Sequence, residues 1–199
     1  MDNDLKNLDN DLTKKSFIYE EFAFEILTSI ECTGCTGKKE ISEDMLSLPL
    51  PMSGIPEPLS LMKCLDAFFK TQSTMQTCKT CQTKTQTTFK KRISKLPNIG
   101  IFQLQRMTPF LDKNQSLVEY PEINLVLNGF SMDHSSYNLS AVCNHVGSST
   151  KNGHYFTFAK SWVDQKWYSF NDQTILPLKN QEVISSEGYI LFYEKQIKT

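Results

Sequence analysis

Two Cys-x-x-Cys motifs, far apart in the chain, constrain the fold more than any other feature of this sequence. The first runs from Cys32 to Cys35 and the second from Cys78 to Cys81. Each motif can point two thiolates at one ion, and two such turns complete a tetrahedral four-sulfur site. A redox-active pair or ordinary buried thiols are the alternatives, but two matched pairs favour closed, structural zinc. We expect Gly34 to assist the first turn by adopting a positive φ.

The compartment decides how the six cysteines are interpreted. The chain shows neither the charged and apolar start of a signal peptide nor an apolar run long enough to span a membrane. Thiols or metal ligands are therefore expected rather than disulfides, in a cytoplasmic or nuclear protein. A formal net charge of −1 gives no reason to expect binding to nucleic acid or to an acidic membrane surface.

The pattern of apolar residues predicts a β-rich α+β fold. The chain of 199 residues is long enough for one domain with a real core, and aromatic and β-branched residues are frequent. The residues from Ser60 to Phe69 have helical spacing, with Ser60 as N-cap and Cys64 on the buried face. Strands are predicted at Phe17–Ile30, Thr83–Lys95, Leu96–Arg106, Tyr137–His145 and Gly188–Tyr193.

The stretch from Gly153 to Asp172 is typical of a β-hairpin, with two aromatic-rich strands around a polar loop. Antiparallel pairing would bring His154 to the same end of the sheet as Asn171 or Asp172. A general base is placed beside its orienting group in this way. An ordinary strand histidine is the alternative, and His145 is a second candidate base. A catalytic metal on both histidines would need a third ligand, which the sequence does not suggest.

Taken together and in this order, the motifs resemble those of the ubiquitin-specific proteases, papain-like cysteine peptidases that remove ubiquitin. The resemblance covers nearly everything after Lys15. The matching segments are Cys32-x-x-Cys35, Ser60–Phe68, Cys78-x-x-Cys81, Leu96–Arg106, Tyr120-Pro121, Tyr137–Val142, His145-x-Gly147, Gly153-His154-Tyr155, Trp167–Asp172 and Tyr189–Tyr193.

The resemblance implies one half of a papain-like hydrolase, an antiparallel palm sheet with an inserted zinc-ribbon fingers subdomain. Residues 1–16 would be a flexible tail, in which an amphipathic turn is the alternative. Residues 17–196 would form the fingers (28–95) and the palm (17–27 and 96–196). The fingers would bind zinc through Cys32, Cys35, Cys78 and Cys81.

The resemblance also assigns roles in the cleft. His154 would be the general base for a cysteine and Asn171 its orienter. Asp172 would be a supporting residue, since it would project to the other face if the strand continued. The substrate channel for the Gly-Gly tail of ubiquitin would involve Gly153, Tyr155 and His145. The loop from His145 to Asn152 would lie over the cleft. Ubiquitin or ubiquitinated proteins are the expected partners.

One motif of the family does not occur in this sequence. The nucleophile of the family lies in an N-terminal motif of the Gly-Asn-Thr-Cys-Tyr type, on the thumb. Cys64 and Cys143 lack the loop-then-helix context that exposes and activates a thiolate. We therefore expect no hydrolysis by this chain alone. The thumb would be missing through truncation, through an incomplete gene model, or because a separate polypeptide supplies it. A catalytically inactive ubiquitin-binding or scaffold module is the alternative.

Overall fold

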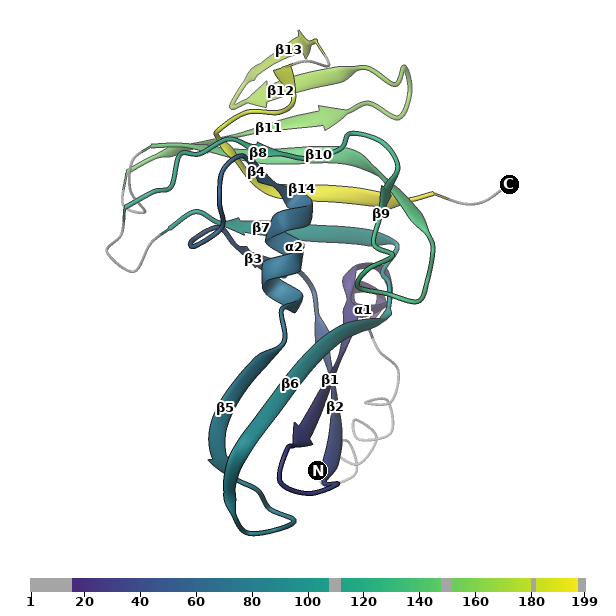
Figure 1. Ribbon diagram of the computed structural model, residues 1–199. Helices are drawn as coiled ribbons and strands as arrows, with labels where there is room; N and C mark the ends of the chain where they lie inside the picture. The colour runs from purple at the N-terminus through teal and green to yellow at the C-terminus, as the bar shows by residue number, and fades with distance from the viewer. Residues whose placement is uncertain (1–15, 108–111, 148–151, 180–181, 197–199) are drawn as a thin grey trace, which may run out of the picture.

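The computed structural model describes residues 16–107, 112–147, 152–179 and 182–196 (Figure 1). Strands dominate, and no helix in these ranges is long and apolar enough to cross a membrane. The elements are α1 (Phe17–Phe22), β1 (Phe24–Cys32), β2 (Lys38–Met45), β3 (Leu48–Pro51), β4 (Leu59–Ser60), α2 (Leu61–Phe69), β5 (Gln72–Thr77), β6 (Lys84–Lys95), β7 (Ile99–Gln105), β8 (Val118–Glu119), β9 (Leu125–Val126), β10 (Ser136–Val146), β11 (His154–Lys160), β12 (Trp167–Asn171), β13 (Thr174–Leu178) and β14 (Gly188–Lys195).

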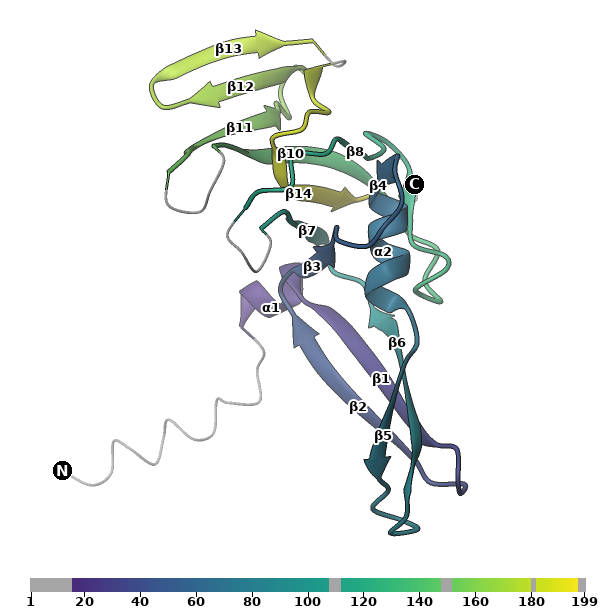
Figure 2. The same ribbon diagram turned by 60° about the vertical axis from the view of Figure 1, so that its left-hand side comes forward.

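A long four-stranded antiparallel sheet extends away from the rest of the molecule (Figures 1 and 2). Its strand order is β2-β1-β6-β5, and its far end carries the two Cys-x-x-Cys turns. The outer strands β2 and β5 are almost entirely exposed, so little core supports this end. A metal site there would supply stability that apolar burial does not.

An eight-stranded sheet forms the other part of the molecule, in the order β13-β12-β11-β10-β14-β7-β3, with β9 paired to β10. All its pairs are antiparallel except β3 with β7. In β7 the residues Gly100, Phe102 and Leu104 are buried and alternate with more exposed neighbours, which is the pattern of a strand with one core face. The sheet therefore buries one face along its central strands.

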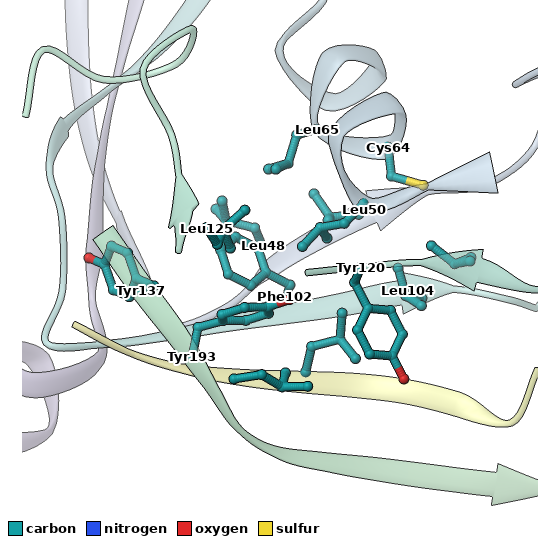
Figure 3. Close-up of a cluster of buried hydrophobic side chains, with 14 of the residues drawn as sticks. Leu48, Leu50, Cys64, Leu65, Phe102, Leu104, Tyr120, Leu125, Tyr137 and Tyr193 are labelled. Atoms are coloured by element: carbon teal, nitrogen blue, oxygen red, sulfur yellow. The ribbon is translucent and has the colours of Figure 1, made fainter. Parts of the chain in front are cut away.

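Helix α2 covers the buried face of the central strands. Its N-cap is Ser60, whose Oγ accepts a hydrogen bond from the backbone N–H of Lys63 at 3.3 Å. Leu65 and Cys64 point from the helix into the core with Leu50 (Figure 3). The predicted helix, its cap and the burial of Cys64 are thus confirmed.

The two large sheets share this core. Phe24, at the start of β1, makes an edge contact with Phe102 of β7, with ring centroids 5.6 Å apart. β3 and α2 fall within the range 28–95 expected for the fingers, but β3 pairs with β7 in the eight-stranded sheet. The four-stranded sheet is therefore assembled from two separate stretches, residues 24–45 and 72–95, and its first strand begins before residue 28.

The strand predicted at Phe17–Ile30 is wrong in its first part. Residues Phe17–Phe22 form α1, and the strand begins only at Phe24. The apolar side chains of Phe17, Ile18 and Tyr19 are exposed, so they line no sheet face. The backbone oxygen of Ser16 accepts the N–H groups of Tyr19 and Glu20, which closes a helical turn instead.

Candidate active site and metal centre

The hairpin of β11 and β12 brings His154 and Asn171 together. Thr157 pairs with Phe170 and Lys160 with Trp167, so the start of β11 lies beside the end of β12. Nε2 of His154 lies 2.6 Å from Oδ1 of Asn171. The imidazole is 47% exposed and so remains accessible to a reacting group.

This contact determines which ring nitrogen can accept a proton. An amide oxygen only accepts hydrogen bonds, so Nε2 of His154 carries the proton and donates it to Asn171. Nδ1 keeps the lone pair and accepts no hydrogen bond within the described ranges. A neutral imidazole in this tautomer, held by an uncharged amide, has the arrangement of a general base.

Asp172 lies near the His154 ring because the strand does not continue through it. β12 ends at Asn171, and Asp172 has φ 51°, a left-handed turn conformation that interrupts the strand alternation. Its Oδ2 atom is 4.0 Å from Nε2 of His154, and its side chain is 80% exposed. Asp172 is therefore a neighbour of the imidazole at the limit of an ion pair, without a hydrogen bond to it.

His145, Gly153 and Tyr155 meet close to His154 in the sheet, with the His145 and Tyr155 rings on the face opposite to the His154 ring. The register of β10 and β11 pairs His145 with Tyr155, and their ring centroids are 4.7 Å apart. His145 is almost fully buried, and burial lowers the pKa of its imidazole. A Cβ atom on residue 153 would fall 2.1 Å from Nε2 of His145, so only glycine fits there. The loop residues 148–151, expected over the cleft, lie outside the described residues.

Tyr155 and Tyr189 extend this cluster toward a surface hollow. Tyr155 is 56% exposed, and its ring centroid is 6.4 Å from that of Tyr189. The hydroxyl of Tyr189 accepts a 2.7 Å hydrogen bond from Nε2 of Gln103. A hollow of about 490 Å³ is lined by Tyr189 and Gln103 with Pro51 and Met107, among others. Tyr189 therefore borders a surface depression, and the exposed Tyr155 ring lies beside Tyr189.

Neither of the two cysteines outside the Cys-x-x-Cys motifs faces His154. Cys64 is fully buried, and burial raises the pKa of its thiol to about 11. Cys143 pairs with Thr157, whereas Val146 pairs with His154. The two pairs are separated by three residues, an odd number, along each strand. Because side chains alternate between faces, Cys143 lies on the opposite face from His154. Burial also raises the pKa of the Cys143 thiol.

The four cysteines of the two motifs converge at the far end of the four-stranded sheet. The Sγ atoms of Cys32, Cys35, Cys78 and Cys81 all lie within 4.8 Å of one another. Those of Cys35 and Cys78 are 3.8 Å apart. Zinc bound tetrahedrally at about 2.3 Å separates its sulfur ligands by about 3.8 Å, so this group fits zinc. Four protein ligands would leave no open position for a substrate.

Hydrogen-bond donors surround these sulfurs. Backbone N–H groups of Cys81 and Thr80 lower the pKa of the Cys78 thiol to about 6. The Thr85 hydroxyl, 3.1 Å from Cys32 Sγ, lowers the pKa of that thiol. Donors of this kind stabilise the thiolate form, which is the form that binds a metal ion.

The role expected for Gly34 is wrong. Its φ is not positive, and the left-handed residue near these turns is Gln82, with φ 57°. A Cβ atom on residue 34 would instead fall 2.6 Å from Cγ2 of Thr85. Glycine is needed there because the Thr85 side chain approaches closely while its hydroxyl contacts Cys32.

The comparisons with known proteins bear on this arrangement. A family model described as ubiquitin carboxyl-terminal hydrolase matches residues 1–193. The chain belongs to this family. It is 38% identical over 178 residues to ubiquitin carboxyl-terminal hydrolase 2 of Gallus gallus, covering 84% of this chain and 49% of that protein. It is 30% identical over 192 residues to ubiquitin carboxyl-terminal hydrolase 21 of Homo sapiens, covering 90% and 34%.

Solved structures of the family share the fold. A yeast SAGA DUB module matches with a TM-score of 0.85 and 25% identity, over 98% of this chain and 46% of the matched chain. A SAGA DUB module bound to monoubiquitin matches with a TM-score of 0.81 and 25% identity, over the same shares. The β-rich papain-like fold with fingers and palm is thus confirmed. The chain spans about half or less of the length of these relatives.

Sequence reasoning missed two cations behind the histidines. Arg106 is fully buried; its Nε donates to the Gly188 carbonyl at 2.6 Å and its Nη1 to that of Ser116 at 2.9 Å. The ammonium of Lys113 donates to the His145 carbonyl. The position of Arg106 at the end of an apolar segment is a weak sequence signal for a buried charge. No sequence pattern around Lys113 indicates a contact with His145.

Proposed function

We propose that this chain forms the fingers and palm of a deubiquitinating cysteine protease and supplies the base side of its active site. His154 is the general base and Asn171 its orienting group. The reaction is hydrolysis of the peptide or isopeptide bond after the C-terminal glycine of ubiquitin. The 2.6 Å contact of His154 Nε2 with Asn171 Oδ1 supports this proposal most strongly, because it leaves Nδ1 available for a thiol proton.

The chemical steps follow from this tautomer. Nδ1 of His154 takes the proton of a cysteine thiol, and the thiolate attacks the carbonyl carbon of the terminal glycine. The tetrahedral intermediate collapses with cleavage of the C–N bond, and His154 gives its proton to the departing amine. His154 then takes a proton from a water molecule, which hydrolyses the thioester and releases the cysteine. Asn171 keeps the ring oriented throughout.

The nucleophile comes from a cysteine outside this sequence. The two cysteines that do not belong to the Cys-x-x-Cys motifs, Cys64 and Cys143, have raised thiol pKa values, and neither faces His154. In this proposal the thumb with the reactive cysteine is contributed by a longer form of this chain or by a separate polypeptide. The chain alone therefore binds ubiquitin without cleaving it.

The exposed Tyr155 ring, with Gly153 and His145 behind it, forms the wall along which the Gly-Gly tail of ubiquitin lies. A flat ring and a missing side chain both suit a slim substrate. Ubiquitin and ubiquitinated proteins are the proposed partners, in the cytoplasm or the nucleus. One relative in the comparisons is a SAGA DUB module bound to monoubiquitin, which is consistent with this partner.

Zinc is the proposed metal of the fingers, held by Cys32, Cys35, Cys78 and Cys81. Its role is structural because four thiolates fill its coordination sphere. It fixes the turns at the far end of the exposed four-stranded sheet, and the fingers then offer a preformed surface to the body of ubiquitin.

Ubiquitin carrying a C-terminal electrophile tests the missing nucleophile. We expect intact-mass spectrometry to find no covalent adduct with the chain, while fluorescently labelled ubiquitin binds saturably. A catalytically inactive ubiquitin-binding module would give the same result, and only added thumb polypeptide separates the two, by restoring cleavage that depends on His154. An adduct on Cys64 or Cys143 would overturn the assignment of the nucleophile, and absence of saturable binding would overturn both functions.

A further inference from the structure

The carbonyl group of His145 lies just beyond the last pairing of β10 with β14. That pairing ends at Asn144 and Gly188, and the N–H of His145 still donates to the Glu187 carbonyl at 2.9 Å. In an antiparallel strand the N–H and C=O of one residue point the same way. The carbonyl of His145 therefore points toward β14 where the ladder has stopped, and it needs another donor.

Lys113 is that donor. Its ammonium bonds to the carbonyl oxygen of His145 and lies in a half-buried position. Burial and the nearby Arg106 lower the pKa of the Lys113 ammonium. Glu187 is close enough to raise that pKa, but among the described residues no carboxylate forms an ion pair with the ammonium. A partly buried ammonium is costly unless such groups or carbonyl groups satisfy it. The His145 carbonyl therefore satisfies the ammonium of Lys113, and the ammonium in turn satisfies a carbonyl that the sheet leaves unpaired.

The backbone around Lys113 is itself fixed. Lys113 forms an antiparallel bridge with Met107, and the N–H of Asn114 donates to the Arg106 carbonyl at 2.7 Å. The Arg106 guanidinium donates to the carbonyls of Asn114 and Gly188 at 3.0 and 2.6 Å. Lys113 thus reaches His145 from a segment tied to both β7 and β14.

The tie to His145 continues to the candidate base. The His145 ring lies directly against Gly153, with no room for a Cβ atom between them. Gly153 precedes His154 in the chain, and Val146, next to His145, pairs with His154. A displacement of His145 would therefore displace the backbone that carries His154.

We infer that Lys113 is a positioning residue for His154, acting through the His145 carbonyl and Gly153. This inference rests on the proposed role of His154 as general base. Without the ammonium, the His145 carbonyl would lose its tie to the segment fixed on β7 and β14, and the His154 ring would be held less firmly against Asn171. Lys113 touches neither the proposed substrate nor the reacting atoms.

NMR of histidine-labelled protein tests this inference without any need for turnover. In the wild-type chain we expect a nuclear Overhauser effect between the His154 ring and the Asn171 side-chain amide. In Lys113→Met we expect this effect to fall at least twofold and the His154 ring signals to broaden. Lys113→Arg keeps a cationic donor and should restore both, and Lys90→Met, an exposed lysine on β6, should change neither.

The outcomes separate the inference from the proposed function. If the wild-type chain lacks the effect between His154 and Asn171, the proposed active-site geometry fails. If the effect is present and unchanged in Lys113→Met, the inference about Lys113 fails, even where the melting temperature falls. If Lys113→Met does not fold, Lys113→Gln replaces it, because glutamine is a shorter, neutral donor. The readouts stay the same: the Overhauser effect between His154 and Asn171, and the width of the His154 ring signals.

Discussion

The imidazole of His145 lies so close to Gly153 that a Cβ atom on residue 153 would fall 2.1 Å from Nε2 of His145 and 2.7 Å from the Val146 carbonyl oxygen. No side chain fits this space. A change in the rotamer of His145 would not relieve the contact, because the Val146 carbonyl oxygen belongs to the backbone. The glycine before His154 is therefore required by packing, whatever its part in substrate binding.

Gly153→Ala should destabilise the protein by about 1–3 kcal/mol, the usual cost of overpacking. Urea unfolding measures this change. Gly129→Ala is the matched control, because a Cβ atom there meets nothing within 4 Å and φ is unexceptional, so a change within about 0.5 kcal/mol is expected. Equal stability of the Gly153→Ala variant and the wild type would contradict the close approach.

Removing one cysteine ligand should remove the metal from the fingers. In Cys78→Ala the remaining three sulfurs no longer complete the site, and a structural zinc site supplies on the order of 10 kcal/mol of apparent binding energy. Metal analysis after dialysis should find zinc with the wild-type chain and none with the variant. In the same variant, amide hydrogen exchange should become faster in β5 and β6.

Cys143→Ala is the control for this experiment, since Cys143 lies in β10 and not in the metal site. It should retain its zinc. Stoichiometric zinc on Cys78→Ala would rule out the four-cysteine site.

Ser60→Ala should weaken the start of α2. The Ser60 hydroxyl accepts the Lys63 N–H, and loss of such an N-cap costs about 1 kcal/mol. Denaturant unfolding provides the measurement, with Ser73→Ala in the exposed strand β5 as the control. No difference between the two variants would mean that the cap contributes nothing.

The buried thiol of Cys64 should make stability depend on alkaline pH. Burial raises its pKa to about 11, from about 9 for an ordinary thiol. Because the folded-state pKa is raised, the thiol contributes stability that is complete below pH 9 and is lost as the pH rises through 11. The free-energy advantage of wild type over Cys64→Ala should shrink by on the order of 2 kcal/mol across this range. A stability difference that stays constant with pH would show that the thiol ionises as readily in the folded state as in the unfolded state.

Much of the fold was predictable because local patterns and long-range packing agree. β7, β10 and β14 carry apolar alternation or buried runs, and Ser60 marks the start of α2. Residues Phe17–Phe22 were not predictable as a helix, since their apolar side chains remain exposed and the sequence suggests burial. The pairing of the two Cys-x-x-Cys turns followed from their matched spacing, and the structure brings all four sulfurs together.

The details around the histidines depend on tertiary contacts that no local pattern encodes. The turn conformation of Asp172 places its carboxylate near His154, although simple strand alternation predicts the opposite face. The bond from Lys113 to the His145 carbonyl joins residues far apart in the chain and depends on where the β10–β14 ladder stops. Such contacts follow from the register of whole strands, which the sequence determines only collectively.

The most direct test of the proposed function is an NMR titration of the histidine-labelled chain with ubiquitin, compared with ubiquitin that lacks its C-terminal Gly-Gly. The account predicts saturable shifts of the His154 and His145 ring signals with intact ubiquitin. His134, in the turn before β10, should stay unchanged, and the truncated ubiquitin should leave the His154 signals in place. Saturating binding that leaves His154 unperturbed, or equal shifts with both ubiquitins, would contradict the claim that this chain presents its base to the ubiquitin tail.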